Sequence, residues 1–233
     1  MDKYNVYQDM SRRTGGEIYL GIVGPVRTGK STFIKRFMEL VVIPEMADDN
    51  EKVRTIDELP QSADGKMIMT TEPKFIPKEA AVIHFSNQET GKIRLIDCVG
   101  YLVPEAVGAI EEEKERMVKT PWSEEEIPFS KAAEIGTSKV IREHSNLGLI
   151  ITTDGSFGDI PAVNFEEALQ KTVMECEKAG KPFLILVNTS RPDSQETIQF
   201  TKRLEAQYGK TVMAVNCKTM DREDVFRIME QLL

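Results

Sequence analysis

The sequence predicts an α/β fold: a mostly parallel six-stranded sheet with one antiparallel edge strand and helices on both faces. After residue 80, short aliphatic runs alternate with amphipathic helical patterns. Two of the runs, residues 147–153 and 182–188, are almost entirely apolar, as parallel strands are when helices cover both of their faces. Residues 87–91 read Asn-Gln-Glu-Thr-Gly, a hairpin-type turn that predicts the antiparallel strand.

Each expected element follows one of two periodicities. Strands rich in β-branched or aliphatic residues are expected at residues 17–24, 80–86, 92–98, 147–153, 182–188 and 211–216. Amphipathic helices are expected at residues 30–40, 130–144, 164–179, 194–208 and 221–233. Residues 41–79 and 100–129 interrupt this alternation with prolines and charges. Because loops of that length in a compact domain are usually functional or mobile, we expect function in both.

Length and composition indicate one domain spanning residues 1–233. The formal net charge of −8 argues against a generic nucleic-acid-binding surface. Three widely spaced cysteines are expected to be buried and reduced, which favours a reducing cytosol. The N-terminus lacks the apolar core of a signal peptide, and no apolar stretch is long enough to span a bilayer. We therefore expect a cytoplasmic protein with neither a transmembrane segment nor a nucleic-acid partner.

A glycine-rich turn after the first strand carries the strongest functional signal. It reads Gly24-Pro-Val-Arg-Thr-Gly-Lys-Ser31, the full G-x-x-x-x-G-K-[ST] phosphate-binding loop, or P-loop. Strand, loop and helix follow one another in the order that this motif requires. Glycines let the backbone curl so that its N–H groups face phosphate oxygens, and the following helix adds the positive end of its dipole. The loop therefore predicts a nucleoside triphosphate bound with Mg²⁺.

Within this loop, three side chains have expected roles. Lys30 is placed to reach the β- and γ-phosphates, and the Ser31 hydroxyl to ligate Mg²⁺. Arg27 could stabilise charge on the transferred phosphoryl group, or it could be a solvated surface residue. The residues expected to line the phosphates are Gly24, Pro25, Val26, Arg27, Thr28, Gly29, Lys30, Ser31 and Thr32.

Two further segments are expected at the phosphates. Asp97 and Gly100 form a D-x-x-G at the end of the third strand, where the acid would steer Mg²⁺ and Gly100 would offer its N–H to the γ-phosphate. Thr70 and Thr71 lie between the first helix and the second strand, and either could ligate Mg²⁺ and sense the γ-phosphate. Tyr101 follows Gly100, where many small GTPases carry a water-orienting glutamine.

The end of the fifth strand bears on which base is bound. Residues 188–191 read Asn-Thr-Ser-Arg where a guanine-binding protein would show N-K-x-D. Asn188 is retained and is expected to contact the nucleotide site. Arg191 stands in place of the aspartate that accepts hydrogen bonds from guanine, so the site lacks the main group that rejects adenine. ATP is thus the expected nucleotide.

These segments together resemble the stage IV sporulation protein A family, the spore-coat basement ATPases of endospore-forming bacteria. The resemblance covers the whole chain. It rests on Val26-Arg-Thr-Gly-Lys-Ser-Thr-Phe33 and Thr70-Thr-Glu-Pro-Lys-Phe75, and on residues 14–20, 57–62, 97–101, 132–137 and 151–155. It implies a P-loop NTPase descended from translation-factor-type GTPases that has switched to ATP. It also implies Lys30, Asp97 and the pair Thr70 and Thr71 as the functional residues.

The same resemblance implies a biological role. Family members assemble themselves, driven by ATP, into a static layer on the outer forespore membrane, facing the mother-cell cytosol. They are about twice this length, so the chain would be the ATPase domain without the C-terminal part that docks a small membrane-anchor peptide. Other coat morphogenetic proteins are further implied partners.

The residues leave three functions open. The first is a Mg²⁺-dependent ATPase whose turnover drives polymerisation. The second is a GTP-gated binding switch, against which the altered residues 188–191 argue. The third is a structural scaffold that binds nucleotide without turnover, which Tyr101 in place of glutamine keeps open. Fold alone does not choose among them.

Overall fold

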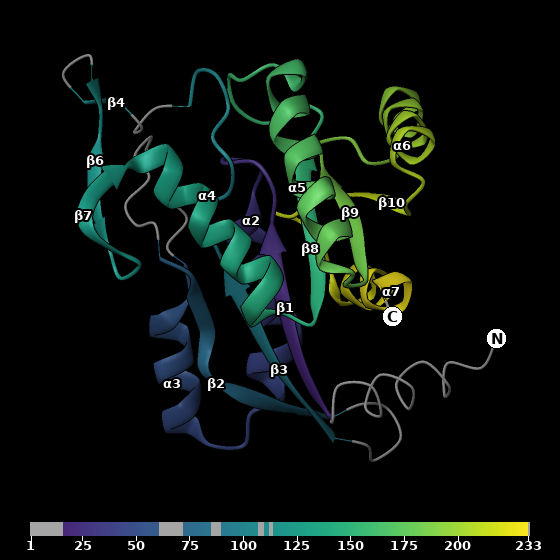
Figure 1. The fold of residues 1–233 in the computed structure, drawn as a ribbon. Coiled ribbons are helices and arrows are strands. Elements are labelled where there is room, and N and C mark those ends of the chain that lie inside the picture. Colours follow the sequence, from purple (N-terminus) through teal and green to yellow (C-terminus); the bar gives the residue numbers. More distant parts are fainter. Residues whose placement is uncertain (1–15, 61–71, 85–89, 107–109, 112–113, 233) are drawn as a thin grey trace.

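A six-stranded sheet forms the centre of the molecule in the computed structural model, which describes residues 16–60, 72–84, 90–106, 110–111 and 114–232 (Figure 1). The strand order is β10-β9-β8-β1-β3-β2. The strands are β1 (Glu17–Val23), β2 (Lys74–His84), β3 (Thr90–Asp97), β8 (Leu147–Thr153), β9 (Phe183–Asn188) and β10 (Val212–Val215). All neighbouring pairs are parallel except β2 with β3. The predicted sheet with one antiparallel edge strand is confirmed.

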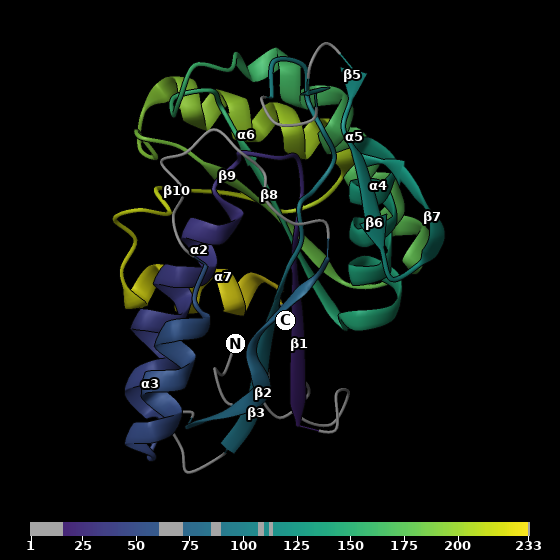
Figure 2. The same cartoon turned by 90° about the vertical axis from the view of Figure 1, so that its left-hand side faces the viewer.

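Alternate residues of the central strands contribute to two separate hydrophobic cores, one on each face of the sheet. In β8, Leu149 packs in the core that holds α2 (Lys30–Phe37) and α7 (Arg222–Leu232), whereas the next residue, Ile150, belongs to the opposite core. That second core includes residues from α5 (Glu166–Ala179) and α6 (Gln195–Tyr208). Side chains of a strand point alternately to its two faces, which explains the almost continuous apolar character of β8. Turning the molecule by 90° places α2 and α7 on one side of the sheet and α4 (Phe129–Lys139) on the other (Figure 2).

Two expected helices change geometry before they end. The helix expected at 30–40 is α-helical only over Lys30–Phe37 and continues as a π-helical turn, Met38–Val42, and a 3₁₀ turn, Ile43–Glu45. The helix α4 likewise continues as a π-helical turn, Val140–His144. The first helical segment therefore runs five residues beyond the expected end at 40, whereas the second, residues 129–144, nearly matches the expected 130–144. Periodicity does not show the change of pitch.

The two stretches that interrupt the alternation contain structure that the sequence analysis missed. Residues 41–79 include the helix α3 (Asp49–Glu58), whose N-terminus is capped by Asp48 accepting a hydrogen bond from the Asn50 N–H at 2.9 Å. They also include the start of β2 at Lys74, six residues before the expected position. Pro77 lies within this strand, and β2 is at the edge of the sheet, where proline is tolerated.

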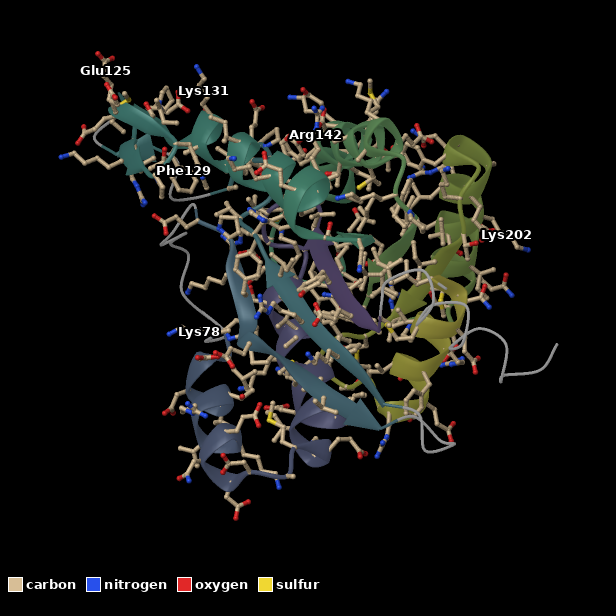
Figure 3. The ribbon with its side chains drawn as sticks, turned by 60° about the horizontal axis from the view of Figure 1, so that its bottom comes forward. Lys78, Glu125, Phe129, Lys131, Arg142 and Lys202 are labelled. Atoms are coloured by element: carbon tan, nitrogen blue, oxygen red, sulfur yellow. The ribbon has the colours of Figure 1, made fainter. Side chains whose placement is uncertain are left out.

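Residues 100–129 contain a hairpin of β6 (Met117–Thr120) and β7 (Ser123–Pro128), and a short pair, β4 (Ile110–Glu111) and β5 (Lys114–Glu115). The hairpin extends from the N-terminal end of α4 away from the central sheet (Figure 1). Figure 3 shows Glu125 on β7 and Lys131 on α4 directed outward at this end of the molecule. Because both strands of the hairpin are largely solvated, they lack the apolar alternation that reveals a strand.

The described part of the chain contains no helix that is long and apolar enough to cross a membrane. Its three cysteines, Cys98, Cys176 and Cys217, are buried and free, as expected.

Candidate nucleotide-binding site

The predicted phosphate loop connects β1 to α2 and requires glycine at two positions. Gly24 and Gly29 have φ angles of 129° and 96°, which side chains rarely adopt. A Cβ atom at Gly24 would lie 2.3 Å from the Ile151 carbonyl oxygen, and one at Gly29 would lie 2.3 Å from Asn188 Nδ2. The loop therefore lies tightly against the ends of β8 and β9.

The helix α2 begins at Lys30, directly after the phosphate loop. Its N-cap residue, Gly29, has no side chain to cap it, and its own first turn contains no acidic residue. The first N–H groups of a helix lack partners within the helix, and here they belong to Lys30, Ser31 and Thr32. An anion placed at this end would accept hydrogen bonds from them and interact favourably with the helix dipole.

Lys30 is 5% exposed and points back over the loop. Its Nζ donates hydrogen bonds to the Pro25 carbonyl oxygen at 2.6 Å and the Gly24 carbonyl oxygen at 3.2 Å. Burial lowers the pKa of this ammonium group. Because the hydrogen bonds of this buried cation in the described residues go to neutral carbonyls, a phosphate would give it an anionic hydrogen-bond partner.

Gly100 approaches this lysine very closely. Its φ is 92°, and a Cβ atom there would lie 2.7 Å from Lys30 Nζ and 2.0 Å from the Gly24 carbonyl oxygen. Any side chain at position 100 would fill the space beside the lysine. The D-x-x-G segment and the phosphate loop thus meet, as the sequence analysis expects.

Ser31 and Asp97 face each other across the same site. The Ser31 hydroxyl donates to Asp97 Oδ2 at 2.9 Å. The other carboxylate oxygen, Oδ1, is buried and has no hydrogen-bond partner among the residues that the structure describes. Burial raises the pKa of Asp97, and the charge of Lys30 and the Ser31 hydrogen bond oppose that shift. Hard cations such as Mg²⁺ take oxygen ligands of this kind, so the free oxygen and the adjacent hydroxyl fit a magnesium ion.

Asn188 occupies a supporting position under the loop. Its Nδ2 donates to the Thr28 carbonyl oxygen at 3.0 Å, and its Oδ1 accepts from the Cys217 N–H at 3.0 Å. The residue is therefore engaged with the phosphate loop and with the segment after β10. These contacts give a reason for an asparagine here that does not involve guanine.

Three other expectations have different outcomes. Arg27 is exposed, with a φ of 63° that non-glycine residues seldom adopt. Tyr101 is 7% exposed and packs with Val26 and Phe165 in a small apolar cluster, so its side chain is not placed to orient water. Its carbonyl oxygen accepts from the Val26 N–H at 2.9 Å, which joins the loop to the segment after Asp97. Thr70 and Thr71 lie outside the described residues.

Comparison with known proteins decides the family. The family model described as "Stage IV sporulation protein A, ATPase domain" matches residues 1–233. The chain belongs to the stage IV sporulation protein A family. Relatives named stage IV sporulation protein A are 50% identical over 233 residues in Bacillus subtilis (strain 168), 49% identical over 233 residues in Bacillus anthracis and 47% identical over 229 residues in Clostridioides difficile (strain 630).

These alignments cover 98–100% of the chain but 47% of each relative, so the chain spans about half the length of the curated relatives it matches. Among solved structures, a variant of SsGBP aligns over 97% of this chain and 59% of its own, with 13% identity and a TM-score of 0.49. A likeness of that size carries no information on the function of this family member.

Asp154 was not among the predicted site residues; it follows β8 and lies beside the residues after β9. Its carboxylate accepts from the Thr189 hydroxyl at 2.6 Å. Two sequence signals could have pointed to it. Residues 151–155 are one of the segments that resemble the family, and the polar run Thr152-Thr153-Asp154 closes an otherwise apolar strand, at the edge of an α/β sheet where functional groups commonly lie.

Proposed function

We propose that this member of the stage IV sporulation protein A family is a Mg²⁺-dependent ATPase that converts ATP and water to ADP and phosphate. The observation that carries the proposal is the convergence of Lys30, Ser31, Asp97 and Gly100 at the uncapped start of α2. A polyphosphate with its metal requires a cation, N–H donors and oxygen ligands. The site offers the buried Lys30, helix N–H groups that have no partner within the helix, and the Asp97 oxygen that has no hydrogen-bond partner among the described residues.

In the proposed reaction the chain supplies position and charge. Lys30 would exchange the Pro25 and Gly24 carbonyls for phosphate oxygens, and the Gly100 N–H would hold the terminal phosphate. Ser31 and Asp97 would hold Mg²⁺, which supplies charge neutralisation when it is bound. Thr70 or Thr71 would complete this set and orient the attacking water. Arg27 would act mainly in the transition state, where charge spreads over the transferred phosphoryl group.

A nucleotide-binding scaffold without turnover is the second candidate, and Tyr101 is the observation that favours it. The side chain is buried in an apolar cluster instead of facing the phosphates, and burial raises the pKa of its hydroxyl. This position thus offers no polar group for water. Release of phosphate from ATP separates the two candidates.

The role of the whole protein is proposed from its relatives. ATP hydrolysis would drive self-assembly of the spore coat basement layer on the forespore surface, in the mother-cell cytoplasm. Other coat proteins would be partners, and a small membrane-anchor peptide would dock to the part of the relatives that this chain does not span.

MgATP binding by two matched lysine variants tests the proposed nucleotide site. Lys30→Ala removes the buried cation, whereas Lys35→Ala removes a partly exposed cation from the same helix, where it pairs with Glu39 at 4.0 Å. Surface pairs of that kind contribute little to stability. By calorimetric titration, Lys30→Ala is expected to lose tight MgATP binding and Lys35→Ala to retain it. Equal, near wild-type affinity in both variants would show that the phosphates bind elsewhere.

A further inference from the structure

The loops after β8 and β9 are joined by a compact polar network centred on Asp154. Its Oδ2 accepts from the Thr189 hydroxyl at 2.6 Å and from the Thr197 hydroxyl at 3.4 Å, and its Oδ1 accepts from the Ser156 N–H at 3.0 Å. Thr189 itself is fully buried. These hydrogen bonds, with Thr197 in the first turn of α6, hold the pKa of Asp154 below its usual range although burial opposes the shift.

The same network fixes the backbone of the segment where a base-reading motif is expected. The Ser190 N–H donates to the Ser156 hydroxyl at 2.8 Å, and the Arg191 N–H donates to the Thr189 hydroxyl at 3.2 Å. Two successive backbone N–H groups of residues 189–191 are thus held by side chains. In contrast, the Arg191 side chain is exposed and pairs only with the exposed Glu196 among the ion pairs of the described residues, at 3.5 Å.

The sheet order places this segment on the nucleoside side of the site. Ligands of such folds lie in the crevice outside the carboxyl ends of the strands. The groups proposed for the metal and the γ-phosphate lie on one side of β1: Asp97 is the last residue of β3, and Gly100 follows that strand. The strands β8, β9 and β10 lie on the other side of β1, so the base would extend over the loops that follow them.

We propose that Asp154 is a positioning residue for base recognition: it fixes Thr189 and so holds residues 189–191 in the arrangement that receives the adenine of ATP. In a guanine-specific site the lysine and aspartate of N-K-x-D would occupy positions 189 and 191. Here the residue at position 189 is turned inward onto Asp154, and an ordered backbone replaces the charged side chains. A loop that is ordered before binding loses less entropy when the ligand arrives.

This inference rests on the proposed ATP site, and a comparison of two probes keeps the two claims separate. MgATP contains a base, and magnesium tripolyphosphate contains only the phosphates. Thr189→Val removes the hydroxyl that Asp154 holds, whereas Thr189→Ser keeps it. Asp154→Ala removes the carboxylate, and Asp159→Asn is the control, since Asp159 is an exposed acid of the same loop.

Asp154→Ala and Thr189→Val are expected to weaken MgATP binding by roughly tenfold to a hundredfold, the range for losing a charge-assisted hydrogen bond. Their affinity for magnesium tripolyphosphate should stay within about twofold of wild type, and KM for ATP should rise while kcat at saturation is kept. Thr189→Ser and Asp159→Asn should behave as wild type.

Equal weakening of both probes would overturn the inference, because Asp154 would then support the phosphate loop or the fold as a whole. Unchanged ATP affinity in both variants would overturn it as well. If the wild-type chain bound neither probe, the proposed function itself would fail.

Discussion

Substituting Gly100 with alanine tests the close approach between the D-x-x-G segment and the phosphate loop. The new Cβ atom would lie 2.0 Å from the Gly24 carbonyl oxygen, a backbone atom that cannot rotate away, and 2.7 Å from Lys30 Nζ. Gly158→Ala is the matched control. Its φ of 79° is comparably unfavourable, but nothing lies within 4 Å of the added atom.

The difference between the variants isolates the steric clash from the backbone strain. A side chain in the left-handed region costs about 1–2 kcal/mol, and both variants carry that cost. Overpacking adds about 1–3 kcal/mol in Gly100→Ala alone. For a chain of this size each kcal/mol corresponds to about 2–4 °C in Tm. We therefore expect Gly158→Ala to lower Tm by about 2–8 °C and Gly100→Ala to lower it by about 2–12 °C more.

Thermal unfolding, monitored by circular dichroism, measures the change in Tm, and titration with a fluorescent ATP analogue measures nucleotide affinity. Displacing Lys30 Nζ should weaken nucleotide binding by Gly100→Ala at least roughly tenfold, whereas Gly158→Ala should bind normally. Equal Tm values for the two variants, with equal nucleotide affinity, would refute the geometry described for Gly100.

Four further outcomes are expected. Asp97→Asn should keep ATP binding but lose most of its Mg²⁺-stimulated phosphate release, and unchanged stimulation would place the metal acid elsewhere. Arg27→Ala should slow turnover roughly ten- to a thousandfold with little change in ATP affinity, and equal loss of affinity and turnover would make Arg27 a ground-state contact. Because a φ of 63° suits glycine, the free energy of unfolding of Arg27→Gly should be about 1 kcal/mol higher than that of Arg27→Ala. Arg191→Asp should shift the ratio of ATP to GTP affinity towards GTP by roughly tenfold, and an unchanged ratio in competition assays would exclude position 191 from base selection. Burial raises the pKa of Cys98 to about 11, so the free energy of unfolding should fall as pH rises from about 9 to about 11, and a urea-unfolding profile that is equally steep in Cys98→Ala would contradict this.

The phosphate loop could be predicted from sequence because its geometry is encoded locally. Gly24 and Gly29 stand where the backbone needs positive φ, and Lys30 follows at the start of a helix. The sheet could also be predicted from sequence, since strands buried on both faces, such as β8, are almost purely apolar. The placement of Asp97 beside Ser31 then follows from the pairing of β1 with β3.

What escaped prediction depends on contacts between segments far apart in the chain. The helix α3 and the hairpin of β6 and β7 are dominated by charged residues, so their periodicity is weak. Asp154 acts through Thr189, which lies 35 residues away, and nothing in the local sequence marks that pairing. Asn188 was expected from its resemblance to a guanine motif, but its hydrogen bonds to Thr28 and Cys217 become visible only in the fold.

Phosphate release by the purified chain shows whether it hydrolyses ATP with Mg²⁺. The assay compares ATP alone, ATP with Mg²⁺ and MgATP with a tenfold excess of GTP, with Lys30→Ala as the inactive reference. We expect phosphate release that requires Mg²⁺, persists in the presence of GTP and disappears in Lys30→Ala. Wild-type release no greater than that of Lys30→Ala, or suppression of release by GTP, would show that the chain is not a Mg²⁺-dependent ATPase of this kind.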